Sequence, residues 1–205
     1  NIELVIVDNC SIDDTCKIIQ QFKFSEHIKS KFLKLECLLP LQDARQFGVE
    51  SCTGEFIAFI DHDDIWLSDH LERSVGHLVS SPHAGCYNSR YILGEEKWIY
   101  VARLALNGVR VIMNQFRPGL SNSIRTHDLI FSSLVVRREV LKGIPFRRYE
   151  MIHDFCLYVD LLLSGFFLKR FFLPGVFYRV HGCSQSKKWK AQWPSELDQF
   201  AESIY

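Results

Sequence analysis

The sequence has no long hydrophobic run, no excess of either charge and no paired cysteine motif. Its longest uncharged apolar stretch in the C-terminal half, residues 161–168, is too short to cross a bilayer. Lysine plus arginine and aspartate plus glutamate both number 24, so the basic footprint of a nucleic-acid-binding protein is missing. The seven cysteines include no Cys-x-x-Cys pair, which predicts reduced thiols in a cytoplasmic protein without a structural disulfide.

The composition is otherwise that of a globular domain. Hydrophobic residues make up 47% of the 205 residues, enough for one substantial core, and sixteen phenylalanines indicate an aromatic core or an apolar acceptor surface. Because the chain starts at Asn1 and enters a strand almost at once, we expect a segment to precede it in the full protein.

Three carboxylates directly follow an apolar run at residues 56–60. The run is too short for an ordinary helix and predicts a strand buried on both faces. Asp61, Asp63 and Asp64 then mark the carboxyl end of that strand, where open α/β sheets bind ligands. Asp61 and Asp63 repel each other unless a cation lies between them, so Mg²⁺ or Mn²⁺ is a natural partner. The alternative is a solvated acidic turn before the next helix.

The first 81 residues alternate between strand and helix patterns. Strands are predicted at residues 2–7, 32–39 and 56–60, and helices at residues 13–23 and 43–52 and after Ser68. We expect Ile18, Ile19 and Phe22 on the buried side of the first helix. The alternation predicts an α/β fold with a mostly parallel central sheet flanked by helices.

The remaining residues give a weaker pattern. Strands are predicted at residues 86–93, 129–137, 166–173 and 176–180, and helices at residues 138–142 and 153–164. Residues 187–205 are expected to form a polar tail. Its lysines and tryptophans at residues 187–193 indicate either a solvated face or contact with a membrane surface or an anionic lipid carrier.

Four segments, in order, resemble motifs of glycosyltransferase family 2, the inverting group with the GT-A fold. They begin with the strand and turn Glu3 to Thr15, the helix Ala44-Arg45-Gln46-Phe47-Gly48-Val49, and the strand and acids from Gly54 to Asp64. The fourth is His153-Asp154-Phe155-Cys156-Leu157-Tyr158, and a weaker fifth is Tyr178-Arg179-Val180-His181. The chain departs from the family at Gln46 (usually Asn), at His153 (commonly Glu), at Asp160 (often Arg) and in lacking the first strand.

The resemblance implies a donor site built on the acidic residues. Asp61 and Asp63 would hold Mn²⁺ or Mg²⁺ and the ribose of a nucleoside-diphosphate sugar, with UDP or dTDP as the expected nucleotide. Asp8 would contact the base or ribose, and its alternative role is to stabilise a turn. Arg45 would pair with phosphate or with Asp61. His181 is a candidate metal or phosphate ligand, with a hydrogen-bonded loop residue as the plainer interpretation.

The resemblance also implies an acceptor site in the second half. Asp154 would be the general base that takes the proton of the acceptor hydroxyl, and its alternative is a first-turn aspartate stabilised by the helix dipole. His153 is either the neighbour of Asp154 in the site or a solvent-exposed replacement, and we expect the latter. Ser132 and Ser133 would border the acceptor, and Arg179 would contact substrate.

The sequence therefore predicts a metal-dependent glycosyltransferase, acting on a saccharide or lipid-linked acceptor in the cytoplasm or at the inner face of the membrane. Residues 1–81 would bind the donor and residues 82–186 the acceptor. The alternative is a non-catalytic sugar-nucleotide-binding or scaffolding domain. A phosphohydrolase of the His-Asp type is disfavoured because His62-Asp63 follows a strand, and a pyrophosphorylase because no glycine-rich basic loop is present.

Overall fold

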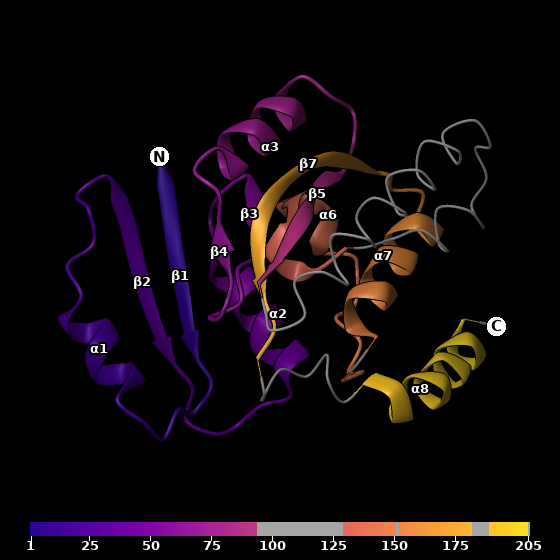
Figure 1. The fold of residues 1–205 in the computed structure, drawn as a ribbon, viewed down its shortest axis with the longest axis horizontal. Coiled ribbons are helices and arrows are strands. Elements are labelled where there is room, and N and C mark those ends of the chain that lie inside the picture. Colours follow the sequence, from indigo (N-terminus) through magenta and orange to yellow (C-terminus); the bar gives the residue numbers. More distant parts are fainter. Residues whose placement is uncertain (94–128, 151, 182–188, 205) are drawn as a thin grey trace.

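A two-stranded parallel sheet forms the N-terminal end of the molecule (Figure 1). The computed structural model describes residues 1–93, 129–150, 152–181 and 189–204. In it, β1 (Ile2–Asp8) pairs with β2 (Ile28–Lys34), and α1 (Thr15–Gln21) connects them. The polar turn after β1 therefore lies at the carboxyl end of that strand, as the sequence predicts.

The apolar side expected for α1 is not buried. Ile18 is 62% exposed and Phe22 is 61% exposed, and α1 contains no buried residue. The prediction fails because, in the part of the chain that the structure describes, no element covers that side of the helix. The apolar spacing correctly predicts a helix here. It does not identify the element against which the apolar side of that helix would pack.

A mixed five-stranded sheet forms the centre, in the order β3-β6-β5-β7-β4. Its strands are β3 (Phe56–Ala58), β4 (Ile65–Trp66), β5 (Gly85–Leu93), β6 (Leu134–Arg137) and β7 (Leu168–Arg179). Only β5 and β7 are parallel neighbours; the other three pairs are antiparallel. The mixed helix and sheet architecture confirms the α/β class, but the expectation of mostly parallel strands is wrong for this sheet. β6 runs back along β3, and β4 turns back after the acidic residues to lie against β7.

β3 is shorter and less covered than its apolar run indicates. Ile57 is buried, but Ile60, beyond the end of the strand, is 44% exposed. Among the described residues, no strand pairing joins β3 to β1. The two sheets are instead connected by α2 (Leu41–Ser51), which buries Val49 in the central core and packs Gly48 against Val7 of β1.

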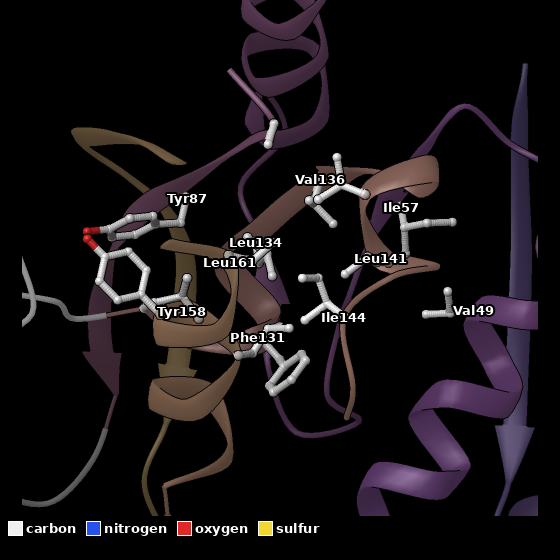
Figure 2. Packing of buried hydrophobic residues seen from close by; sticks show 14 of the residues in the cluster. Val49, Ile57, Tyr87, Phe131, Leu134, Val136, Leu141, Ile144, Tyr158 and Leu161 are labelled. Atoms are coloured by element: carbon white, nitrogen blue, oxygen red, sulfur yellow. The ribbon is translucent and has the colours of Figure 1, made fainter. Parts of the chain in front are cut away.

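The sheet is packed on both faces. Figure 2 shows residues of the first of the two cores described next. Leu134 and Val136 of β6 enter one core with η1 (Phe131–Ser133), α6 (Arg138–Leu141) and α7 (His153–Leu163). Val135, between them, enters the other core beneath α3 (His70–Val79). This is the alternation of a strand covered on both sides. It places η1, which carries Phe131, directly beside the end of β3.

A helix stands where a polar tail is expected. α8 (Trp189–Ser203) packs Phe200 against Ile152, Cys156 and Val159 at the side of α7. The prediction of a tail is wrong for these residues because Leu197 and Phe200, three positions apart, give the helix an apolar side. The structure describes neither residues 187 and 188 nor the side chains of residues 189–193. Membrane contact by this cluster therefore stays a prediction.

Among the described residues, no helix has both the length and the apolar character needed to span a membrane. Six described cysteines are free thiols. The prediction of no disulfide is therefore consistent at those six positions, and Cys183 falls outside the described residues.

Candidate functional site

The acidic turn between β3 and β4 holds its three carboxylates in different environments. The backbone N–H of Asp64 donates to the carbonyl of Asp61 at 3.1 Å, which closes the turn. The side chain of Asp61 is 39% exposed and that of Asp63 is 26% exposed, whereas Asp64 is buried. The turn therefore presents two acids to a ligand and directs the third inward.

Arg45 joins α2 to the acidic turn, and its predicted pairing with Asp61 is present. Its Nη2 lies 2.8 Å from Oδ1 of Asp61, and its guanidinium carbon lies 4.0 Å from the ring centroid of Phe131. The Arg45 side chain is only 10% exposed, and within the described part of the chain its Nη1 has no hydrogen-bond partner. A buried guanidinium with an unused donor is suited to an anionic ligand, because an unsatisfied buried donor is costly.

The end of β7 meets the turn from the other side. Nε2 of His181 lies 3.0 Å from Oδ2 of Asp63, and the backbone N–H of Arg179 donates to Oδ1 of Asp64 at 3.0 Å. Burial raises the pKa of Asp64, although the Arg179 amide opposes this. Oδ2 of Asp64 has no partner among the described residues. Arg179 thus contributes its backbone to the turn, while its side chain is exposed.

These residues fit a divalent cation only in part. In the described ranges no three His, Cys, Asp or Glu side chains converge on one point. Asp61, Asp63 and His181 supply oxygen and nitrogen donors at one place, which is fewer than a cation requires. Mg²⁺ is commonly held by one or two carboxylates together with substrate phosphates and water, and this arrangement allows that. The fit depends on a diphosphate completing the shell.

Asp154 and His153 begin α7, and both are partly covered. The backbone N–H of Phe155 donates to Oδ1 of Asp154 at 2.8 Å, which occupies one oxygen of that carboxylate. The Nδ1 atom of His153 lies 3.0 Å from the carbonyl of Glu150, and its ring centroid lies 5.6 Å from that of Phe131. His153 is half-buried rather than a solvent-exposed replacement. Phe131 thereby brings α7 next to Arg45.

Ser132 and Ser133 do not border an open acceptor site, and that expectation is corrected. Both are fully buried. The hydroxyl of Ser132 accepts from the backbone N–H of Asp61 at 3.0 Å, and its carbonyl accepts from Nε1 of Trp66 at 2.7 Å. The hydroxyl of Ser133 donates to the carbonyl of Ile130 at 2.9 Å. Ser132 therefore supports the acidic turn from the core of the protein.

Asp8 lies at the carboxyl end of β1, where its carboxylate is used by the local turn. Oδ1 accepts from the backbone N–H of Ser11 at 3.3 Å, and the Cys16 thiol donates to Oδ2 at 3.1 Å. Hydrogen bonding from Ser11 lowers the pKa of Asp8 in spite of its burial. This is the turn-stabilising role, and contact with a nucleobase or ribose stays a prediction.

A separate pocket of about 310 Å³ lies between α2 and α6. Its lining combines apolar and charged side chains and is made by Gln46, Val49, Glu50, Arg138, Leu141, Lys142, Ile144 and Phe146. It contains none of the acids of the turn. The candidate site is therefore defined by the acidic turn and its partners and not by the volume of this pocket.

The comparisons with known proteins agree with the motifs. A family model described as Glycosyl transferase family 2 matches residues 1–144. The chain belongs to glycosyltransferase family 2. It is similar to the Escherichia coli UDP-Glc:alpha-D-GlcNAc-diphosphoundecaprenol beta-1,3-glucosyltransferase WfaP, with 26% identity over 188 residues that are 91% of this chain and 68% of WfaP.

Solved structures place this family 2 chain in the GT-A fold. S. aureus TarS 1–349 in complex with UDP-GlcNAc matches with a TM-score of 0.68 and 16% identity, over 90% of this chain and 51% of that one. A Mycobacterium tuberculosis glucosyl-3-phosphoglycerate synthase in complex with Mn²⁺, UDP and phosphoglyceric acid matches with a TM-score of 0.62 and 16% identity, over 97% and 67%. The chain thus spans about half of the TarS structure.

Two residues support the candidate site from the core: Phe131, for which the sequence predicts no role, and Ser132, which it predicts at the acceptor. The ring of Phe131 contacts both Arg45 and His153, and the hydroxyl of Ser132 accepts from the Asp61 amide. Phe131 and Ser132 lie in an apolar segment for which the sequence predicts a strand. The available signal was the Ser-Ser pair that interrupts the apolar run from Leu129 to Val136. A polar pair inside such a run needs hydrogen-bond partners in the core.

Proposed function

We propose that this chain transfers a sugar from a nucleoside-diphosphate sugar to a saccharide or lipid-linked acceptor with inversion. The observation that carries the proposal is the acidic turn, where Asp61 pairs with Arg45 and Asp63 pairs with His181. The names of WfaP and TarS support a UDP-linked donor, and the name of WfaP supports a diphospholipid acceptor. The family and the GT-A fold support transfer as the reaction class.

In this proposal, the first half of the chain binds the donor. Asp61, Asp63 and His181 would hold Mn²⁺ or Mg²⁺ with the diphosphate, and the ion would neutralise the charge that develops on the leaving group. The unused Nη1 of Arg45 would donate to the diphosphate. Asp8 would lie toward the nucleoside, and residues 1–81 would form the donor part of the domain.

The second half would bind the acceptor, with Asp154 as general base. The acceptor oxygen forms a bond to the anomeric carbon, the bond from that carbon to the phosphate oxygen breaks, and the nucleoside diphosphate leaves with the electron pair. Asp154 takes the proton of the acceptor hydroxyl. Inversion is a single displacement, so no enzyme nucleophile is required. Residues 82–186 would form this acceptor part. We place the reaction at the cytoplasmic face of a membrane, where a soluble nucleotide sugar can meet a lipid-linked acceptor.

Two isosteric variants test the proposal together. Asp63→Asn should weaken Mn²⁺-dependent UDP binding, measured by calorimetry, because one carboxylate leaves the diphosphate poorly neutralised. Asp154→Asn should keep UDP affinity but lower kcat by about a hundred- to ten-thousand-fold, measured as UDP-glucose turnover, because an amide cannot take the proton.

The two variants also separate the alternatives. If Asp63→Asn binds UDP as the parent does with Mn²⁺ present, the donor site is misplaced. If the parent binds UDP with Mn²⁺ but releases no sugar to any acceptor, the domain is a non-catalytic sugar-nucleotide-binding module. If Asp154→Asn turns over within a few-fold of the parent, Asp154 is only a helix-dipole residue, whose loss costs about 0.3–1 kcal/mol of stability.

A further inference from the structure

His153 has a fixed orientation at the start of α7. A carbonyl oxygen can only accept, so the 3.0 Å contact between Nδ1 and the Glu150 carbonyl places the proton of the neutral ring on Nδ1. Nε2 then carries the lone pair. Among the described residues, Nε2 has no hydrogen-bond partner, and the imidazole is only partly covered.

The segment that orients His153 is itself held from α8. The carboxylate of Glu196 accepts from the backbone N–H of Glu150 at 3.2 Å and from that of Ile152 at 3.3 Å. These two bonds fix the backbone on either side of residue 151. The Glu150 carbonyl that contacts the imidazole therefore lies between two peptide groups that a side chain from another helix holds in place.

The environment keeps the ring neutral and close to the proposed chemistry. Burial lowers the pKa of His153, the charge of Asp154 opposes this, and Arg45 adds to the lowering. The charge of Asp61 also acts on the ring, in the same direction as Asp154. His153 and Arg45 both lie against Phe131, at 5.6 Å between ring centroids and 4.0 Å from the guanidinium carbon. A neutral, partly exposed imidazole whose Nδ1 carries the proton can accept a hydrogen bond from a hydroxyl group at Nε2.

We propose that His153 is a substrate-contacting residue, whose Nε2 accepts a hydrogen bond from a hydroxyl group of the acceptor saccharide beside Asp154. The inference rests on the proposed function and extends it to a residue that the family motif does not supply. One carboxylate oxygen of Asp154 already accepts a hydrogen bond from the backbone N–H of Phe155. Nε2 of His153 would accept from a second hydroxyl group of the same sugar, which orients the attacking hydroxyl and leaves its single proton for Asp154.

The test compares His153→Phe with His153→Gln. Phenylalanine keeps an aromatic ring against Phe131 but removes Nε2, while glutamine can place an acceptor near the position of Nε2. With UDP-glucose, Mn²⁺ and a short-chain α-D-GlcNAc-diphospholipid, His153→Phe should raise the acceptor KM by about three- to tenfold, as expected for one lost hydrogen bond. His153→Gln should recover part of that loss. UDP affinity should be unchanged in both.

A measurement without turnover tests the same contact. In ¹⁵N spectra of the histidine ring, Nδ1 should be protonated, and the Nε2 signal should move when the GlcNAc-diphospholipid is added to protein saturated with UDP and Mg²⁺. An acceptor KM in His153→Phe equal to that of the parent, or protonated Nε2 with bare Nδ1, overturns the proposal. Loss of Mn²⁺-dependent UDP binding in the parent would instead overturn the proposed function, and this inference with it.

Discussion

At the scale of single residues, Ser132 connects the acidic turn to the core. Its hydroxyl accepts from the Asp61 amide, and its carbonyl accepts from the Trp66 indole, so one buried residue holds both ends of the turn. Arg45 approaches the same turn from α2 and covers the neighbouring Phe131. The positions of the two exposed acids therefore depend on a serine that no ligand touches.

Ser132→Ala should lower both stability and ligand affinity. The variant leaves the Asp61 amide without its acceptor, which costs about 1–3 kcal/mol of unfolding free energy. It also releases Asp61, so Mn²⁺-dependent UDP binding should weaken. Ser133→Ala is the matched control, because its hydroxyl bonds only within its own turn to Ile130. Urea unfolding and calorimetry on both variants check this, and equal UDP affinity in the two would contradict the role given to Ser132.

The sequence predicts the acidic residues of the turn better than it predicts the buried residues that hold them in place. Asp61 and Asp63 stand where an apolar run changes abruptly to charge, and the pairing of Arg45 with Asp61 was among the expected alternatives. The sequence predicts Ser132 at the acceptor site, whereas the structure shows it bonded to Asp61, a contact that spans 71 positions of the chain. Such a contact leaves no local signal. The same holds for His153, whose neighbour Phe131 comes from another element.

At the scale of elements, α3, β5 and β7 meet at a point where only glycine fits. A Cβ on Gly175 would lie 2.6 Å from Nδ1 of His70 and 2.8 Å from Cβ of Asn88. His70 and Asn88 are both fully buried, and Asn88 also donates to Ser74 of α3 at 3.0 Å. The close approach seats α3 on the sheet beside β4, which follows the acidic turn.

Gly175→Ala should destabilise the protein by about 1–3 kcal/mol, because the added methyl must displace packed atoms of the core. Gly76 offers a control inside α3, since a Cβ there meets nothing within 4 Å. Gly76→Ala should stabilise the protein by about 0.5–1 kcal/mol through helix propensity. Thermal unfolding of both variants measures the difference. Equal melting temperatures would show that the core yields at Gly175.

Helix patterns in the sequence gave positions for α2, α6 and α7, because apolar residues recur along each helix. Strand directions were less accessible. The four residues of β6 do not indicate that this strand runs antiparallel to β3 and β5. The relative strand direction depends on pairing partners more than forty residues away in the sequence. The expectation of a parallel sheet rests on the βα alternation of the first 81 residues, but among the strands of that part only β1 and β2 pair in parallel, while β3 and β4 pair antiparallel with later strands.

At the scale of the whole molecule, α8 closes the side of α7 that faces away from the sheet. Phe200 lies in a cluster with Ile152, Cys156 and Val159. The ion pair between the partly exposed Arg147 and the buried Asp160, with contacts of 2.7 and 2.9 Å, lies beside it. Since Asp160 is committed to that pair, it is a poor alternative to Asp154 as the base.

Phe200→Ala should cost about 3–5 kcal/mol, the range for removing a buried aromatic side chain. Phe167→Ala is the control, because that side chain is 63% exposed and its truncation should cost well under 1 kcal/mol. Hydrogen exchange of α7 amides gives a second measurement. If α8 supports α7, Phe200→Ala should speed exchange in residues 153–163 more than in α3; uniform acceleration would contradict that link.

The position of Glu196 has a genetic consequence. The family signature ends at residue 144, but the carboxylate that holds the amides of residues 150 and 152 is encoded about fifty codons later. A premature stop or frameshift in that interval would leave the signature and the acidic turn of Asp61 and Asp63 in the product. The start of α7 would lose its anchor, and a stop before codon 153 would remove His153 and Asp154 as well. A gene of this kind can thus retain the signature without encoding the anchor, and the start of α7 is held only if the reading frame continues through the codon for Glu196.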